Sequence, residues 1–357
     1  MFRSYAETPP KGWNSWDSFG ASVTEEEVLG NAEVMAKSLK DYGWEYIVVD
    51  IQWYEPLADS CAYHPFTELR QDEYSRLIPA ENRFPSSKGR LGFKPLADAV
   101  HAMGLKFGIH TMRGIPRQAV HGNSPILGTQ KTARDIADTN SICPWNTDMY
   151  GVDNTKDGAQ AYYDSLLALY ASWGVDFLKV DDIADSKLYG THSGEIELIR
   201  KAIDSCGRPM VLSLSPGPAP IERGTFFQRN ANMWRLTDDL WDNWEQLYDM
   251  FGRCGKWSAF VGTGAWPDCD MLPLGHIGTR TAADGSEARM TRFTKEEQRS
   301  LMTLWSIFRS PLLFGGDLRK LDDWTHSLLS EPYLIDAHQN GRDPKEVYRK
   351  EDLVIWV

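Results

Sequence analysis

Several aspartates follow directly after short apolar segments of the chain. They are Asp50, Asp181, Asp182, Asp238, Asp239, Asp268 and Asp270. A lone aspartate after a strand is more often a helix N-cap or a turn residue. A carboxylate beside a buried segment is costly unless it is paired, so a repeated pattern of this kind indicates a site. Paired carboxylates serve as nucleophile and acid/base at a glycosidic carbon.

Cations accompany two of these carboxylates. Lys179 precedes Asp181 by two residues, so in a strand both side chains lie on one face, and Arg235 precedes Asp239 by four. Aspartate clusters also hold Mg²⁺ in some barrels. The chain has no HExxH motif, and residues 153–158 miss the EF-hand pattern, so we expect neither a metal nor a cofactor.

The apolar segments alternate with helix-length amphipathic stretches. The segments are residues 11–16, 46–50, 106–110, 177–181, 210–215, 233–239, 268–272 and 311–316. Alternation of this kind indicates a parallel sheet, because parallel neighbours need a crossover. Eight units without a Gly-rich phosphate turn predict an α/β fold of the (β/α)8 TIM-barrel type rather than a doubly wound sheet. The active site of such a barrel lies at the carboxyl ends of its strands.

Helix signals support this plan. Thr24 and Glu27 form a capping-box pattern that opens a helix toward Gly43. Further helices are predicted over residues 159–173, 195–205 and 296–309, and each ends near a glycine or proline.

The pattern changes near residue 322. Residues 347–350 and 353–357 are typical of β-strands, and two strands do not form an independent domain. We therefore expect a catalytic barrel over residues 1–322. Residues 323–357 are then a linker and the first strands of a C-terminal antiparallel β-domain that is incomplete in this chain.

Composition excludes several classes of protein. The net charge of −12 argues against a nucleic-acid partner, and no apolar stretch reaches the length of a membrane span. The five cysteines form no CxxC pair, which favours free thiols. Because residues 1–7 lack the apolar core of a secretory signal, we expect a cytoplasmic protein, or a secreted one if a signal was removed. The sequence does not decide the oligomeric state.

Five ordered motifs resemble those of glycoside hydrolase family 27, the α-galactosidase and α-N-acetylgalactosaminidase family of clan D. They are Gly12-Trp13-Asn14-Ser15-Trp16, Lys179-Val180-Asp181, Arg235-Leu236-Thr237-Asp238-Asp239, Trp266-Pro267-Asp268-Cys269-Asp270-Met271-Leu272 and Ser310-Pro311-Leu312-Leu313-Phe314-Gly315-Gly316-Asp317. The resemblance runs from residue 10 to about residue 318. This family also carries a C-terminal antiparallel β-domain.

The resemblance implies a retaining exo-glycosidase. Asp181 would be the nucleophile and Asp239 the acid/base, while Lys179 and Arg235 would hold ring hydroxyls and keep Asp181 ionised. Trp16 and Trp53 would form the aromatic walls of the sugar-binding site. The other substrate-binding residues would be Asp50, His110, Ser215 and Asp270. The implied substrate is an oligosaccharide or glycoconjugate ending in α-D-galactose or α-N-acetylgalactosamine.

Two departures concern the sugar. Family α-galactosidases end their second strand in two aspartates that bind O4 and O6, whereas Ile51 stands at the second position here. Loss of a charged hydrogen bond costs about 1.5–3 kcal/mol unless Gln52 or Glu55 replaces it. On the fifth strand, Ser215 and Gly217 would leave room for an N-acetyl group.

Other readings stay open. The same fold and mechanism could serve a β-L-arabinopyranosidase or an isomaltodextranase-like α-glucan hydrolase. A non-catalytic carbohydrate-binding barrel would explain Ile51 and Asp182 as drift, and a metal-dependent enolizing barrel would require metal. Cys143 lies near a family disulfide position whose partner is Ile183 here, so that bridge cannot form.

Overall fold

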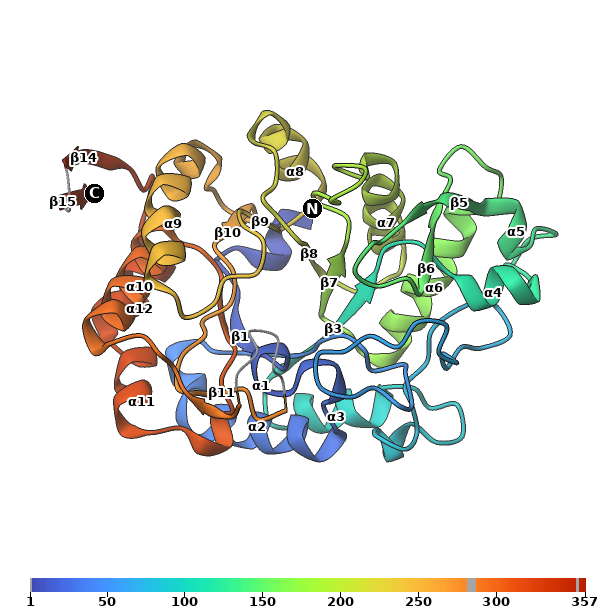
Figure 1. Ribbon diagram of the computed structural model, residues 1–357, viewed down its shortest axis with the longest axis horizontal. Coiled ribbons are helices and arrows are strands. Elements are labelled where there is room, and N and C mark those ends of the chain that lie inside the picture. The colour runs from blue at the N-terminus through green and yellow to red at the C-terminus, as the bar shows by residue number, and fades with distance from the viewer. Residues whose placement is uncertain (1, 281–286, 351–352) are drawn as a thin grey trace.

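Eight parallel strands curl around a common axis in the computed structural model, which describes residues 2–280, 287–350 and 353–357 (Figure 1). Their order is β10-β9-β8-β7-β3-β2-β1-β13. The strands are β1 (Lys11–Asn14), β2 (Tyr46–Val49), β3 (Lys106–Met112), β7 (Phe177–Asp181), β8 (Val211–Leu214), β9 (Met233–Arg235), β10 (Trp266–Asp268) and β13 (Leu312–Phe314).

The segment after β10 closes the ring. Leu272 pairs in parallel with Phe314 of β13, and its backbone N–H donates to the carbonyl of Leu313 at 2.8 Å. The predicted (β/α)8 barrel is therefore confirmed. Nearly every strand position is buried, which agrees with apolar runs rather than an alternating pattern, since a parallel sheet is covered on both faces.

Helices form the outer layer around the strands (Figure 1). The longer ones are α2 (Glu25–Ser38), α3 (Lys94–Ala102), α6 (Ala159–Trp173), α7 (Ser193–Ser205), α8 (Gly224–Asn230), α9 (Trp244–Trp257) and α10 (Lys295–Phe308). The capping box at Thr24 is present, and α6 has the predicted bounds, with left-handed Gly174 as its C-cap. Among the described residues, no helix is both long and apolar enough to cross a bilayer.

Two long insertions lie over the carboxyl ends of the strands. The first runs between β2 and α3 and is largely irregular. The second, between β3 and α6, holds an antiparallel sheet of β4 (Ile115–Pro116), β6 (Met149–Val152) and β5 (Ala137–Ile142), with α4 (Arg117–Gly122) and α5 (Ala133–Ile136).

Short elements complete the barrel. They are α1 (Trp16–Phe19), the strand pair β11 (His276–Ile277) and β12 (Arg289–Met290), and 3₁₀ turns at Phe2–Ala6, Gly20–Ser22, Lys40–Tyr42, Pro85–Ser87, Ile221–Arg223, Ser258–Phe260 and Leu318–Lys320.

The segment expected to be a linker is helical at first. It forms α11 (Asp323–Leu329) and α12 (Pro332–Asn340), and α12 packs on α10. Local capping explains these helices, because the Asp322 carboxylate accepts the first free N–H groups of α11 and Pro332 opens α12. The antiparallel pair β14 (Glu346–Lys350) and β15 (Leu353–Trp356) follows, which agrees with the predicted strands. The domain limits themselves stay a prediction.

Candidate active site

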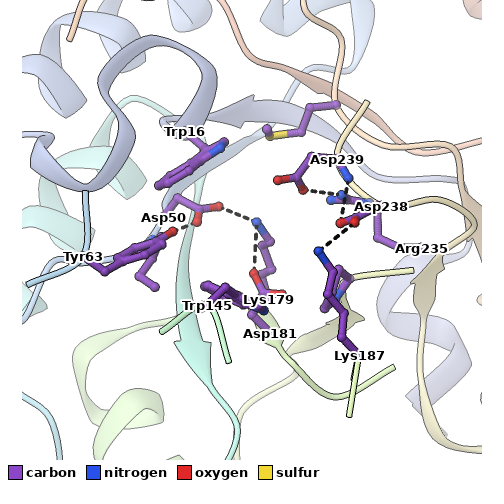
Figure 2. Close-up of a pocket in the computed structure, with 13 residues that line it drawn as sticks. Trp16, Asp50, Tyr63, Trp145, Lys179, Asp181, Lys187, Arg235, Asp238 and Asp239 are labelled. Atoms are coloured by element: carbon purple, nitrogen blue, oxygen red, sulfur yellow. Dashed lines mark hydrogen bonds and ion pairs between the residues drawn. The ribbon is translucent and has the colours of Figure 1, made fainter. Parts of the chain in front are cut away.

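A cavity of about 200 Å³ opens at the carboxyl ends of the barrel strands (Figure 2). It is lined by Trp16, Asp50, Ile51, Tyr63, Trp145, Lys179, Asp181, Lys187, Pro216, Arg235, Asp238, Asp239 and Met271. Six residues predicted from the sequence therefore meet in one place. These are Trp16, Asp50, Lys179, Asp181, Arg235 and Asp239.

Lys179 links two carboxylates in the floor of this cavity. Its Nζ lies 2.8 Å from Oδ2 of Asp50 and 3.7 Å from Oδ2 of Asp181. The Asn14 side chain also donates to Oδ2 of Asp50, at 2.6 Å. Burial alone would raise the pKa of Asp50, but Lys179, His110 and the Asn14 hydrogen bond together outweigh it and hold the pKa below its ordinary value. Asp50 is thus a fixed, ionised acceptor.

His110 lies within β3, two residues before its end, and is placed behind Asp181 rather than in the cavity lining. Its ring is fully buried, and Nε2 lies 3.2 Å from Oδ2 of Asp181. Burial raises the pKa of Asp181, but Lys179 and His110 together lower it below its ordinary value. The ring contacts this carboxylate and is not among the residues that line the cavity, so a contact between His110 and substrate stays a prediction.

Arg235 connects the other candidate catalytic carboxylate to the barrel. Its Nη2 lies 2.8 Å from Oδ1 of Asp239, and its Nη1 lies 2.7 Å from Oδ1 of Asp270. The Asp239 side chain is 60% exposed, so water and a leaving group can reach it.

Asp270 lies behind Arg235, where it is buried and does not line the cavity. Its carboxylate also accepts the backbone N–H groups of Leu240 and Met271, at 2.7 and 2.6 Å. Asp270 therefore holds Arg235 and the segment after Asp239, and its contact with substrate stays a prediction.

The aromatic wall differs from the predicted one. Trp16 stacks on Tyr63, with ring centres 6.1 Å apart, and Tyr63 contacts Trp145. Trp53 is fully buried, donates its indole N–H to the carbonyl of His110 at 2.7 Å and packs among aromatic rings. The prediction for Trp53 is thus wrong, because the chain turns this ring into the space between strand and helix. Tyr63 and Trp145 come from the two insertions, whose sequences carry no periodic signal.

The segment after the fifth strand is placed differently from the expectation, and substrate binding by Ser215 stays a prediction. Ser215 is buried with its N–H bonded to the carbonyl of Val180, and Pro216 lines the cavity instead. A Cβ on Gly217 would lie 2.5 Å from the carbonyl oxygen of Thr237. Glycine is therefore needed there for close backbone approach, and its small size opens no room for an N-acetyl group.

Ile51 lines the cavity beside Asp50. Its backbone N–H donates to Oδ1 of Asp50 at 2.8 Å. The Gln52 amide is engaged with Asp148, and the Glu55 carboxylate accepts from Thr67. Because Gln52 and Glu55 are both fully buried and outside the lining, neither replaces the acceptor that Ile51 lacks.

No group of three His, Cys, Asp or Glu side chains in the described ranges could hold a metal ion. The five cysteines are free thiols, although Sγ of Cys254 lies 3.4 Å from Sγ of Cys269.

The closed barrel with two cation-paired carboxylates at its mouth defines a glycoside hydrolase, and comparisons with known proteins agree. The family model "Alpha galactosidase A" matches residues 154–340. The chain is 29% identical to an α-galactosidase of Cyamopsis tetragonoloba over 98% of this chain and 69% of that protein. It is 28% identical to an α-N-acetylgalactosaminidase of Gallus gallus over 94% and 71%. The chain therefore belongs to glycoside hydrolase family 27.

Two solved structures are more similar. A family 27 β-L-arabinopyranosidase from Geobacillus stearothermophilus, solved as a variant with arabinose, has a TM-score of 0.99 and 69% identity. That match covers 100% of this chain and 83% of the other. A putative α-N-acetylgalactosaminidase from Bacillus halodurans has a TM-score of 0.88 and 64% identity, covering 98% and 80%.

Proposed function

We propose that this glycosidase is a retaining β-L-arabinopyranosidase that releases terminal β-L-arabinopyranose from oligosaccharides or glycoconjugates. The observation that carries the proposal is Ile51 in the cavity lining beside Asp50. The similarity to the Geobacillus stearothermophilus enzyme supports it.

The stereochemistry explains why Ile51 matters. β-L-Arabinopyranose has the ring configuration of α-D-galactopyranose but lacks its hydroxymethyl group. Asp50 and Lys179 supply an acceptor and a donor for ring hydroxyls, while Ile51 supplies only apolar surface. Burying the extra hydroxyl of galactose without a partner costs about 1–3 kcal/mol, or roughly a factor of 10 to 100 in kcat/KM.

The catalytic steps follow from the carboxylate positions. Asp181 attacks the anomeric carbon and the bond to the leaving oxygen breaks, while the protonated Asp239 gives its proton to that oxygen. In the second step Asp239 takes a proton from water, the water oxygen attacks the anomeric carbon, and the bond to Asp181 breaks. Lys179 and His110 keep Asp181 ionised for the first step.

The test exchanges the residue that selects the sugar. In Ile51→Asp we expect kcat/KM on nitrophenyl β-L-arabinopyranoside to fall and that on nitrophenyl α-D-galactopyranoside to rise, changing their ratio at least tenfold. Ile51→Val is the matched control and should keep the wild-type preference, because its side chain stays apolar. A ratio that is the same in all three proteins would refute the role given to Ile51.

A further inference from the structure

An ion pair crosses the mouth of the cavity beside the candidate acid/base. Nζ of Lys187 lies 3.1 Å from Oδ2 of Asp238, and the two side chains are 58% and 52% exposed. Both residues line the cavity, but they come from different loops, one after β7 and one after β9. In Figure 2, Lys187 points toward Asp238 from the side of the cavity opposite Trp16 and Tyr63.

The loop that carries Lys187 is held in a tight turn. The backbone N–H of Ser186 donates to the carbonyl of Gly190, and that of Gly190 donates back to Ser186, both at 2.9 Å. The hydroxyl of Tyr189 donates to the carbonyl of Asn140 in the neighbouring insertion. Lys187 therefore projects from a turn that backbone hydrogen bonds hold in place.

Asp238 is held just as firmly next to Asp239. Its Oδ1 accepts the backbone N–H of Asp239 at 3.1 Å. The carbonyl of Thr237 accepts from Gly217 at 2.9 Å, and the N–H of Leu240 donates to Asp270 at 2.7 Å. The segment is thus fixed on both sides of the two aspartates.

We infer that Lys187 and Asp238 bind the leaving group of the substrate and that they suit a polyhydroxylated one, a second sugar unit rather than an apolar aglycone. The inference rests on the proposed function for the role of Asp239. Asp239 must reach the glycosidic oxygen, and Lys187 and Asp238 line the same cavity beside it, so we place the group beyond that oxygen against this pair. The ammonium of Lys187 offers only donors and the carboxylate of Asp238 only acceptors, and sugar hydroxyls satisfy both.

Because Lys187 and Asp238 are exposed, sugar hydroxyls can replace the water around them at a small cost in free energy. A pair that is more than half exposed contributes little to stability, and its charges stay in contact with water. Hydroxyls of a leaving sugar can replace water around each charge without leaving an unpaired buried group. On the other side of the cavity, Tyr63 and Trp145 provide an apolar face for the ring of the leaving sugar.

The experiment separates contact with the leaving group from proton donation. Three β-L-arabinopyranosides are compared: a nitrophenyl glycoside, a methyl glycoside and a disaccharide. The methyl glycoside needs a proton from Asp239 as the disaccharide does, but its leaving group has no further hydroxyls. In Lys187→Met and in Asp238→Asn we expect the ratio of kcat/KM for the disaccharide to that for the methyl glycoside to fall about tenfold, the effect of one lost charged hydrogen bond.

Two variants complete the design. Lys201→Met, on the exposed side of α7, removes a lysine far from the cavity and should keep the wild-type ratio. Lys187→Arg keeps the charge and should recover most of that ratio.

An equal loss on the methyl glycoside and the disaccharide would mean that the pair acts on Asp239, and would overturn the inference. Wild-type kcat/KM values on both substrates would overturn it too. If the wild-type enzyme prefers α-D-galactosides, the same three leaving groups on that sugar test the inference, so its failure is distinct from failure of the proposed function.

Discussion

At Asp181 two opposing effects meet in one carboxyl group. Burial at the floor of the cavity favours the neutral acid, while the ammonium of Lys179 and the ring of His110 favour the carboxylate, and together they outweigh burial. The spacing of Lys179 and Asp181 along one strand made their proximity predictable. His110 comes from the adjacent strand, so its contact with Asp181 follows only from the register of β3 and β7.

Removing the cation should therefore change the pH dependence of the reaction. In Lys179→Met, the charge that stabilises the Asp181 carboxylate against burial is removed. The pKa of Asp181 therefore rises, and a smaller fraction of Asp181 is ionised at acidic pH. The acidic limb of the kcat/KM profile should move to higher pH, with kcat/KM at the optimum reduced by about 10- to 100-fold. Lys179→Arg retains the charge and should keep the limb near its wild-type position. An unmoved limb in Lys179→Met would contradict this electrostatic role.

Replacing the nucleophile should remove turnover without unfolding the protein. Asp181→Asn keeps the shape of the side chain, so thermal unfolding should still show a folded protein while activity is lost. In Asp181→Gly, azide can occupy the vacated space and attack the anomeric carbon directly. The product should be a glycosyl azide of inverted configuration, detectable by NMR. Unaltered activity in Asp181→Asn would exclude Asp181 as the nucleophile.

At the scale of elements, the strands and helices were predictable and the insertions were not. Apolar runs marked the eight strands, and the Thr24 capping box and Gly174 marked helix ends, because these signals are local. Tyr63 and Trp145 lie in irregular insertions, where tertiary contacts alone decide which side chains face the cavity. Trp53 was placed wrongly because its position near a strand end does not reveal which way the ring turns.

The loop after β9 depends on a close backbone contact that can be tested. In Gly217→Ala, the new Cβ would lie 2.5–2.6 Å from the carbonyl oxygens of Thr237 and Arg235. The segment that carries Asp239 must shift, and misplacement of a catalytic group by about 1 Å costs roughly a factor of 100. We expect kcat to fall at least tenfold.

Gly252 in α9 provides the control for that substitution. No heavy atom lies within 4 Å of a Cβ at this position. Gly252→Ala should leave kcat unchanged and stabilise the protein by up to about 1 kcal/mol, because alanine is the better helix former. Equal kcat values for the two alanine variants would show that the contact at Gly217 does not position Asp239.

For the molecule as a whole, the ordered motifs predicted the barrel and its family. They did not predict helices α11 and α12, because the residues that cap these helices lie in a stretch expected to be a linker. Localisation in the cytoplasm stays a prediction.

The packing of α12 on the barrel buries His338 completely. Its Nε2 lies 2.7 Å from the carbonyl oxygen of Ser310.

Burial, with the nearby Lys11 and Arg309 cations, lowers the pKa of His338 to about 3. The unfolded chain takes up a proton near its ordinary pKa of about 6.5, so below that pH the unfolded state binds more protons than the folded state. The neutral histidine's contribution is complete above pH 6.5 and is lost as the pH falls toward 3, by at most about 1.4 kcal/mol per pH unit. Thermal unfolding of His338→Gln should depend less steeply on pH between 6.5 and 4.5 than that of the wild type. Identical slopes would contradict this.

The sugar preference of the wild-type enzyme is measured by one comparison of two substrates. Values of kcat/KM are measured on nitrophenyl β-L-arabinopyranoside and nitrophenyl α-D-galactopyranoside, with Asp181→Asn as the blank and NMR following the first sugar anomer released. We expect the arabinoside to be preferred at least tenfold and the first product to be β-L-arabinopyranose. A preference for the galactoside would contradict the assignment as an arabinopyranosidase, and α-L-arabinopyranose as the first product would contradict the retaining mechanism.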